Sequence, residues 1–351
     1  MQQRRTIVSV LGASALVLTL AACGSSEADT ADGDGPSGSL TIACGAMEDL
    51  CQAWTSAFTE ATGVQTSFVR LSSGETVARL EAARSAPEFD VWHGGPVDGF
   101  GAAKEQELLA SYESPNAEEI PAEYRDDEGY WTGVYLGVLG FCSNESILDN
   151  LGVDAPTSWD DLLAPELSGQ VSTAHPSTSG TAFTTLWTQV ERLGGEDAAF
   201  DYMSQLHTNV LQYSKSGTAP GQHAGRGEVA VGLVFAHDCV KYREEGMTDL
   251  VVSFPEDGTG YEIGGVALVA GSGNEEAAQA YIDWALTPEA QNIGTTVGSY
   301  QALTHPDAQV DDRMVQLDSV NLVDYDFAEA AAQKPTLTAR FDAEIASQPR
   351  D

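Results

Sequence analysis

Short apolar segments alternate with amphipathic segments near the start of the chain, and this alternation limits the fold more than any other sequence feature. The sequence predicts, in order, a strand at Leu40–Ala43, a helix at Glu48–Thr62 that stops at Gly63, a strand at Val64–Leu71, a helix opening on the capping box Ser72–Glu75, and a strand at Phe89–Trp92. Strand–helix–strand alternation at this spacing indicates an α/β lobe with a mainly parallel sheet.

A second lobe is expected from the length of 351 residues, because one hydrophobic core rarely serves a chain of this size. The long apolar segment Gly133–Cys142 is where the chain could cross between lobes. Further strands are predicted at Gln170–Ala174, Glu228–Ala236, Leu250–Phe254 and Ile263–Ala270, and further helices after Ser177–Thr181, from Asn274 to Leu286 and from Thr287. The fold class is therefore α/β.

The first 22 residues have the pattern of an export signal. Arg4 and Arg5 precede the mostly apolar stretch Ile7–Leu20, which ends in a small-residue run closing on Cys23. This pattern predicts a lipoprotein signal peptide over 1–22 with Cys23 lipidated; an ordinary secretory peptide is the alternative. Residues 23–38 read as a flexible tether. The expected location is the cell envelope, at the outer face of the cytoplasmic membrane or in the periplasm.

The charge balance excludes several classes of partner. The chain has 16 Lys and Arg against 53 Asp and Glu, a formal charge of −37. Recognition of a phosphate backbone requires clustered basic residues, so a nucleic-acid binder is excluded. A polybasic membrane-surface protein is excluded for the same reason. The acidic residues are interpreted as a solvated surface.

Cysteine usage agrees with export. With Cys23 assigned to lipid, Cys44, Cys51, Cys142 and Cys239 remain, an even number suited to an oxidising compartment. Three pairings are open; we favour Cys44–Cys51, which would join a strand to the next helix, together with Cys142–Cys239. Since no Cys-x-x-Cys spacing occurs, a zinc site is not expected, and we predict neither metal nor cofactor.

Motifs for catalysis are missing. The sequence contains no Gly-x-Ser-x-Gly, His-Glu-x-x-His or Walker A pattern, and its six histidines never occur at i, i+4 spacing. An enzyme is thus disfavoured, although an exported hydrolase with Ser, His and Asp from separate segments remains an alternative, because catalytic triads need not be local in sequence.

Several motifs resemble one family of transport receptors. They are Arg70–Glu75, Phe89–Gly95, Ser179–Ala182, Gly258–Gly264 and Asp283–Gln291. Over about residues 40–300 the body resembles the solute-binding lipoproteins of bacterial ABC importers, in the class of ferric-ion-, hexose-phosphate- and aminoethylphosphonate-binding proteins. The resemblance implies a monomeric, two-lobed type II periplasmic binding protein with a two-strand hinge, a ligand in the cleft, and a permease and an ATPase as partners.

The resemblance also implies how the chain divides between the lobes. Lobe 1 would comprise 39–136 and 261–300, and lobe 2 would comprise 137–260 and 301–351. Two predicted helix N-termini would then face the cleft, one opening at Ser73 and Gly74 and the other at Ser179, Gly180 and Thr181. Free backbone amides at helix N-termini bind anions without Arg or Lys. Ser72 and Ser179 could instead only cap their own helices.

Other candidates follow apolar strands. Ala46, His93 and Gly94 lie at predicted carboxyl ends of parallel strands, where clefts form in open sheets; the glycines could merely form a turn. His237-Asp238 and Glu262 flank apolar strands. The spacing is similar to that of the hexose-phosphate binder, where the corresponding residues contact sugar hydroxyls. A structural His–Asp pair beside Cys239 is the alternative.

Ferric binding is the alternative ligand class. Iron binders of this class have two adjacent tyrosines near the end of the strand that precedes His237, but Val234–Asp238 contains none, so the phenolate ligands suited to ferric iron are missing. The sequence therefore predicts a receptor for a small phosphorylated ligand, with hexose phosphate favoured and a phosphonate next.

Overall fold

The computed structural model describes residues 38–349. The predicted signal peptide, Cys23 and nearly all of the tether lie outside these residues. The strands are β1 (Ser39–Cys44), β2 (Gln65–Arg70), β3 (Val91–Pro96), β4 (Leu109–Ala110), β5 (Thr132–Asn144), β6 (Val171–Ala174), β7 (Val210–Ser214), β8 (Val231–Phe235), β9 (Leu250–Ser253), β10 (Tyr261–Val269) and β11 (Ala302–Leu303). The α-helices are α1 (Glu48–Thr62), α2 (Ser73–Ala82), α3 (Val97–Glu105), α4 (Glu145–Leu151), α5 (Gly180–Leu193), α6 (Glu196–His207), α7 (Ala219–Gly225), α8 (Ala236–Glu244), α9 (Glu275–Ala285), α10 (Pro288–Gln291), α11 (Ile293–Thr296) and α12 (Phe327–Phe341).

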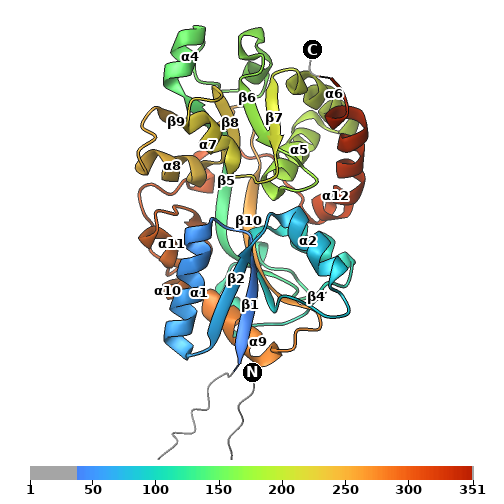
Figure 1. The fold of residues 1–351 in the computed structure, drawn as a ribbon, viewed down its shortest axis with the longest axis vertical. Helices are drawn as coiled ribbons and strands as arrows, with labels where there is room; N and C mark the ends of the chain where they lie inside the picture. Colours follow the sequence, from blue (N-terminus) through green and yellow to red (C-terminus); the bar gives the residue numbers. More distant parts are fainter. Residues whose placement is uncertain (1–37, 350–351) are drawn as a thin grey trace, which may run out of the picture. The chain divides into compact units, whose positions relative to one another are not determined.

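The strands form one hydrogen-bonded path in the order β2-β1-β3-β10-β5-β8-β6-β7. At one end β1 pairs in parallel with β2 and β3, and at the other β6 pairs in parallel with β7 and β8. Between them β10 and β5 pair antiparallel, side by side as Figure 1 shows. The first part of β5 pairs with β10 and its second part with β8 and β9, so one strand serves both groups. The α/β class is confirmed.

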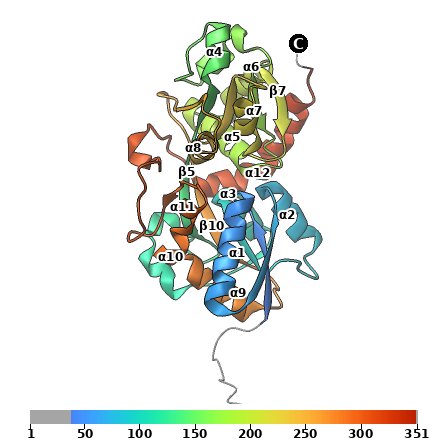
Figure 2. The same ribbon diagram turned by 60° about the vertical axis from the view of Figure 1, so that its left-hand side comes forward.

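The hydrophobic core follows the same division. One cluster gathers around β1, α1 and α9, with Trp54, Phe58 and Tyr281 among its buried rings, and Figure 2 shows α1 and α9 beside each other. Another gathers around β6, β8 and α5, with Trp159 and Phe183 at its centre. The two-lobe division and its boundaries remain a prediction.

Helix α1 matches its prediction because local sequence specifies it. Leu50, Trp54 and Phe58 recur at i, i+4 spacing and are buried on one face. Gly63 ends the helix with a φ of 79°, a left-handed conformation that glycine adopts without steric cost. The acidic residues Glu48 and Asp49 occupy the first turn, where the helix dipole favours negative charge.

Helix α3 was not predicted, because Gly99 and Gly101 interrupt the apolar pattern. Its glycines serve close packing: a Cβ on Gly101 would lie 2.6 Å from the Cβ of Ala331 in α12. Across this contact Lys334 of α12 donates to the buried carboxylate of Asp98 in α3, with Nζ 2.5 Å from Oδ1. Helix α12 is thus attached to α3, the helix that follows β3.

Two disulfides form among the described residues. Cys44–Cys51 links the end of β1 to α1. Cys142–Cys239 links β5 to α8 across 97 residues of sequence. Both are the pairs that the sequence analysis favoured. No helix within residues 38–349 has the length and apolar character needed to cross a membrane.

Candidate ligand-binding cavity

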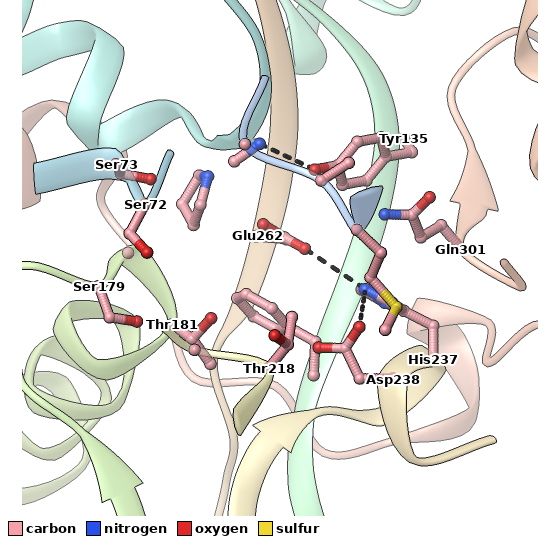
Figure 3. Close-up of a pocket in the computed structure, with 18 of the residues that line it drawn as sticks. Ser72, Ser73, Tyr135, Ser179, Thr181, Thr218, His237, Asp238, Glu262 and Gln301 are labelled. Carbon is pink, nitrogen blue, oxygen red and sulfur yellow. Dashed lines mark hydrogen bonds and ion pairs between the residues drawn. The ribbon is translucent and has the colours of Figure 1, made fainter. Parts of the chain in front are cut away.

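A cavity of about 40 Å³ lies where several strand ends and helix N-termini converge. Figure 3 shows Ser73, Ser179 and Thr181 on one side, Tyr135, His237 and Gln301 on the other, and Glu262 between them. The lining residues are Gly45, Ala46, Met47, Arg70, Ser72, Ser73, Gly95, Pro96, Tyr135, Ser179, Gly180, Thr181, Gly217, Thr218, Phe235, His237, Asp238, Glu262, Ser299 and Gln301. Of the eleven residues predicted for ligand binding, the cavity brings eight together; Gly74, His93 and Gly94 are not part of its wall.

The N-termini of α2 and α5 meet at one end of the cavity. Ser73 is 4 % exposed and Thr181 is 8 % exposed. A Cβ on Gly180 would lie 2.8 Å from Ser73 Oγ, so a glycine is required for this close approach. The amides of Gly180 and Thr181 lie in the first turn of α5 and have no carbonyl partner earlier in that helix. This end therefore presents hydroxyl and amide donors.

The two flanking serines cap their helices and also line the cavity. Ser72 forms the predicted capping box, its amide donating to Glu75 Oε2 over 3.2 Å. Ser179 Oγ accepts from the amide of Ala182 over 3.3 Å. Capping leaves a hydroxyl able to make a further hydrogen bond, so the structural and ligand-contact interpretations are compatible.

Gly74 has a different role from the one predicted. Its amide donates to the carbonyl of Thr178 over 2.9 Å, and a Cβ there would lie 2.1 Å from the carbonyl oxygen of Ser177. Gly74 thus joins the N-terminus of α2 to the turn before α5. Its amide is committed to the protein, which is why it is not a free donor in the cavity.

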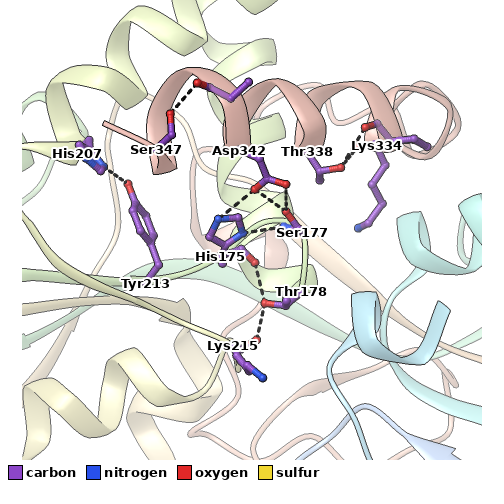
Figure 4. A network of polar contacts seen from close by, with 12 residues as sticks. His175, Ser177, Thr178, His207, Tyr213, Lys215, Lys334, Thr338, Asp342 and Ser347 are labelled. Atoms are coloured by element: carbon purple, nitrogen blue, oxygen red, sulfur yellow. Dashed lines mark hydrogen bonds and ion pairs between the residues drawn. The ribbon is translucent and has the colours of Figure 1, made fainter. Parts of the chain in front are cut away.

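Side-chain contacts with Asp342, in the C-terminal segment, hold the turn before α5 in place (Figure 4). Asp342 Oδ1 lies 3.3 Å from His175 Nε2 and 3.1 Å from Ser177 Oγ. Thr178 Oγ1 donates to the Lys215 carbonyl over 3.0 Å. These contacts hold the approach to Ser179 in place. Burial lowers the pKa of His175, and the nearby Asp342 carboxylate acts in the opposite direction.

Arg70, a cation that the sequence analysis did not include in the site, lines the cavity. Its Nε donates to the Ala46 carbonyl over 3.2 Å, and its Nη2 donates to Ser216 Oγ over 3.0 Å. Arg70 is the last residue of β2, and one residue, Leu71, separates it from the serines that open α2. Its position at the carboxyl end of a parallel strand was therefore the signal that could have identified it. The cavity wall therefore includes a guanidinium beside the amide and hydroxyl donors that the sequence predicted.

The opposite end of the cavity holds two carboxyls and an imidazole. His237 and Asp238 lie in the first turn of α8, and Glu262 lies in β10. His237 Nε2 is 3.6 Å from Asp238 Oδ1 and 4.0 Å from Glu262 Oε1. Among the described side chains, His237 Nδ1 and Asp238 Oδ1 are buried without a hydrogen-bond partner. Unsatisfied buried polar atoms facing a cavity suit a polar ligand.

Burial dominates the protonation of this cluster. It lowers the pKa of His237 to about 3 and raises that of Asp238 to about 7, the latter opposed by Arg70 and Lys241. The pKa of Glu262 is raised well above its ordinary value by burial and by the neighbouring Asp238 and Asp98 carboxylates. The imidazole is therefore neutral, and the carboxyls hold protons readily.

Tyr135 connects the two ends of the cavity wall. Its hydroxyl accepts from the Gly95 amide over 2.8 Å. Burial raises its pKa well above the usual value, and the carboxylates of Glu262 and Asp238 act in the same direction. The phenol is thus neutral. Tyr135 lies in the apolar segment Gly133–Cys142, where no sequence pattern separates a ligand contact from a core residue.

His93 and Gly94 lie inside β3 rather than after it, because the strand runs on to Pro96. The His93 ring stacks on Trp54 at a centroid distance of 3.9 Å, and its Nδ1 is 2.9 Å from Tyr281 Oη. His93 therefore packs in the core behind the cavity. The Gly94 carbonyl accepts from Trp92 Nε1 over 3.0 Å. Ala46 does line the cavity.

A group with metal-binding residue types lies elsewhere, where Glu119, His305 and Asp307 place one ligand atom each within 4.8 Å of the others. His305 Nδ1 accepts from the Asp307 amide over 3.1 Å, so its proton is on Nε2, 3.0 Å from Glu119 Oε2. A metal would need that nitrogen deprotonated. The cluster is accounted for by these two hydrogen bonds.

The chain matches a family model described as bacterial extracellular solute-binding protein, over residues 88–331. An uncharacterised Haemophilus influenzae protein is 38 % identical over 88 % of this chain and 91 % of its own length. Two more distant relatives are a Serratia marcescens Fe(3+)-binding periplasmic protein, 23 % identical over 82 % of this chain and 85 % of its own length, and a putative 2-aminoethylphosphonate-binding periplasmic protein of Salmonella typhimurium, 29 % identical over 50 % of this chain and 49 % of its own length.

Solved structures share the whole fold. The periplasmic binding protein AfuA of Actinobacillus pleuropneumoniae, with exogenous fructose-6-phosphate bound, superposes with a TM-score of 0.86 at 37 % identity, covering 89 % of this chain and 99 % of AfuA. The periplasmic binding protein P5PA superposes with a TM-score of 0.84 at 32 % identity, covering 88 % and 99 %. The expected type II periplasmic-binding-protein fold class is thereby confirmed.

Proposed function

Because this chain belongs to the family of bacterial extracellular solute-binding proteins, we propose that it captures a small phosphorylated organic molecule in the cavity between Ser73 and His237. A hexose phosphate is the first candidate. The phosphate would accept hydrogen bonds from Ser73, from the N-terminus of α5 and from Arg70. The organic part would face His237, Asp238 and Glu262.

The observation that carries this proposal is the chemical difference between the two ends of one cavity. Amide and hydroxyl donors gather at the end formed by α2 and α5, and the Arg70 guanidinium also lines the cavity. Carboxyl and imidazole groups gather at the other end, with buried atoms lacking partners. Hydrogen-bond donors and a helix N-terminus stabilise an anion, whereas carboxylates accept hydrogen bonds from hydroxyl groups. A sugar phosphate has these two kinds of groups, and AfuA provides a precedent in its bound fructose-6-phosphate.

A phosphonate with an amino group is the second candidate. Its ammonium would pair with Asp238 and Glu262 in place of the sugar hydroxyls. Ferric iron is less suited to the cavity: Tyr135 is the only phenol among the lining residues, and its hydroxyl already accepts from Gly95. Ferric iron prefers several hard anionic oxygen ligands.

The same proposal includes the cellular setting. We propose that Cys23 anchors the chain through lipid, that the receptor works as a monomer, and that it delivers ligand to the permease and ATPase of an ABC importer. Lobes comprising 39–136 with 261–300, and 137–260 with 301–351, would close on the ligand around β5 and β10.

Calorimetry with purified protein tests the ligand class. Fructose 6-phosphate, 2-aminoethylphosphonate, inorganic phosphate and ferric citrate are titrated in turn, with thermal unfolding as a parallel measurement, because a tight ligand raises the melting temperature by mass action. We expect fructose 6-phosphate to bind more tightly than inorganic phosphate. A protein that binds only ferric citrate, or none of the four, would overturn the proposal.

A further inference from the structure

Gly137 lies behind the cavity rather than on its wall, at the point where β5 passes Glu262. The two residues are register partners in the antiparallel pairing of β5 with β10. Tyr135, two residues earlier in β5, faces the cavity, and side chains two apart in a strand share a face. A side chain at position 137 would therefore point toward the polar end of the cavity.

There is no room for that side chain. A Cβ at Gly137 would lie 2.7 Å from Glu262 Oε1 and 2.8 Å from His237 Cε1, closer than real Cβ contacts. Gly137 is not among the glycines with positive φ. Glycine is therefore needed here because a side chain would not fit, and not because of the backbone conformation. An alanine at this position is compatible with the strand and would act by displacing its two neighbours.

The displaced groups are the ones that would face the organic part of the ligand. His237 and Glu262 lie 4.0 Å apart and are both buried, and the cavity in front of them measures only about 40 Å³. Moving either group forward takes space from the ligand. The donors at Ser73 and Thr181 come from other elements, α2 and α5, and the atoms nearest to a Cβ at position 137 belong to Glu262 and His237 instead.

We propose that Gly137 is a positioning residue that determines specificity: its missing side chain lets Glu262 and His237 recede, which makes room for the hydroxylated part of a sugar phosphate. This inference rests on the proposed function and deepens it. Gly137→Ala should weaken recognition of the organic part and leave phosphate capture intact.

The matched control is Gly140→Ala in the same strand. A Cβ there would lie 3.0 Å from Phe254 and 3.1 Å from the Ser253 carbonyl, a tight site away from the cavity. Calorimetry with fructose 6-phosphate and with inorganic phosphate is run on wild type and both variants. We expect Gly137→Ala to lose about tenfold or more in affinity for fructose 6-phosphate, with inorganic phosphate changed less than about twofold. Gly140→Ala should change neither.

A double-mutant cycle identifies the residue through which position 137 acts. Glu262→Ala removes the Oε1 and Cγ atoms that a Cβ at 137 would contact. In that background Gly137→Ala should cost less than about threefold for fructose 6-phosphate. Equal losses for both ligands in the single variant would overturn the inference, whereas equal losses in both backgrounds would assign the effect to His237, whose Cε1 still lies 2.8 Å from a Cβ at position 137. Should Gly137→Ala alone not fold, the double variant is measured in its place, because it lacks the contact with Glu262.

One readout needs no ligand and so separates this inference from the proposed function. His237 in wild type has a pKa lowered to about 3 by burial. NMR titration of its ring proton, assigned with His237→Gln, should show titration closer to pH 6.5 in Gly137→Ala, because the displaced ring gains contact with water. Identical titration in both proteins would refute the positioning role. Absent binding of both phosphates to wild type would refute only the proposed function.

Discussion

His237 Nε2 lies 3.6 Å from Asp238 Oδ1, yet both side chains are buried with polar atoms that no other described group satisfies. Adjacent residues at the start of α8 thus present an imidazole and a carboxyl to the same cavity. Such an arrangement is costly for folding and suits a site that a ligand completes.

The first prediction concerns the pH dependence of stability in Asp238→Asn. The Asp238 pKa is raised from 3.8 to about 7, so the wild type loses stability as pH rises from about 4 to 7, where the unfolded chain has released a proton that the folded chain still holds. Asparagine does not titrate, so the variant lacks this pH-dependent loss of stability. We expect the variant to equal wild type near pH 4 and to exceed it by up to about 4 kcal/mol at pH 8.

Urea unfolding of both proteins between pH 4 and pH 8 measures this difference. Comparing the variant with wild type cancels the contribution of the many surface carboxylates. A constant difference across the range would show that Asp238 is not the group responsible. The same variant should bind fructose 6-phosphate more weakly, since asparagine replaces one carboxyl oxygen with an amide nitrogen that cannot accept a hydrogen bond.

The second prediction concerns Arg70. Its guanidinium is the cation on the cavity wall, so Arg70→Met should reduce affinity for phosphorylated ligands by about 10- to 100-fold. Arg79→Met is the control, because Arg79 pairs with Glu88 on the exposed face of α2 and the substitution changes net charge equally. Equal effects of the two substitutions on affinity in calorimetry would mean that long-range charge, and not contact, controls binding.

The third prediction concerns Thr181, whose hydroxyl lies at the N-terminus of α5. Thr181→Val preserves shape and removes a donor, and affinity for sugar phosphate should fall about five- to tenfold with little change in melting temperature. Thr185→Val, one turn further along α5, removes a hydroxyl that donates to the Thr181 carbonyl and does not line the cavity. It should leave affinity unchanged. Unaltered affinity in Thr181→Val would remove this hydroxyl from the site.

The fourth prediction compares the disulfides. Cys142–Cys239 closes a loop of 97 residues and Cys44–Cys51 one of 7. In the chain-entropy account, removing the longer link should cost about 4–5 kcal/mol and the shorter about 2 kcal/mol. Guanidinium unfolding of the paired Cys→Ala variants measures both. Cys142–Cys239 also fixes α8 against β5, so its loss should weaken ligand binding as well. A larger loss of unfolding free energy on removing Cys44–Cys51 would contradict the chain-entropy explanation.

The fifth prediction concerns the buried pair between α3 and α12. Lys334→Met leaves Asp98 buried without its cation, which should cost about 3–5 kcal/mol of unfolding free energy. Adding Asp98→Asn should recover much of the loss, since no charge then remains buried. A double variant as unstable as Lys334→Met would show that packing, and not charge, is responsible.

Local sequence determined the elements whose ends are marked by residues with strong conformational preferences. Gly63 stops α1, Ser72 and Glu75 open α2, and Thr287 with Pro288 begins α10, each where the sequence predicted. Caps and left-handed glycines act within a few residues of chain, so their effects do not depend on the rest of the fold. The helix N-termini at Ser73 and Ser179 were predictable for this reason.

Only the tertiary structure decided which of these residues share a cavity. Arg70 lines it while His93 packs against Trp54, and the sequence does not distinguish the two, because the sequence pattern places both at the carboxyl ends of predicted parallel strands. Gly74 gives its amide to Thr178, a partner about 100 residues away. In the sequence, Gly137 is one more residue of an apolar strand. Only the structure shows that Glu262 and His237 lie against it. Such roles arise from long-range packing, which sequence periodicity does not encode.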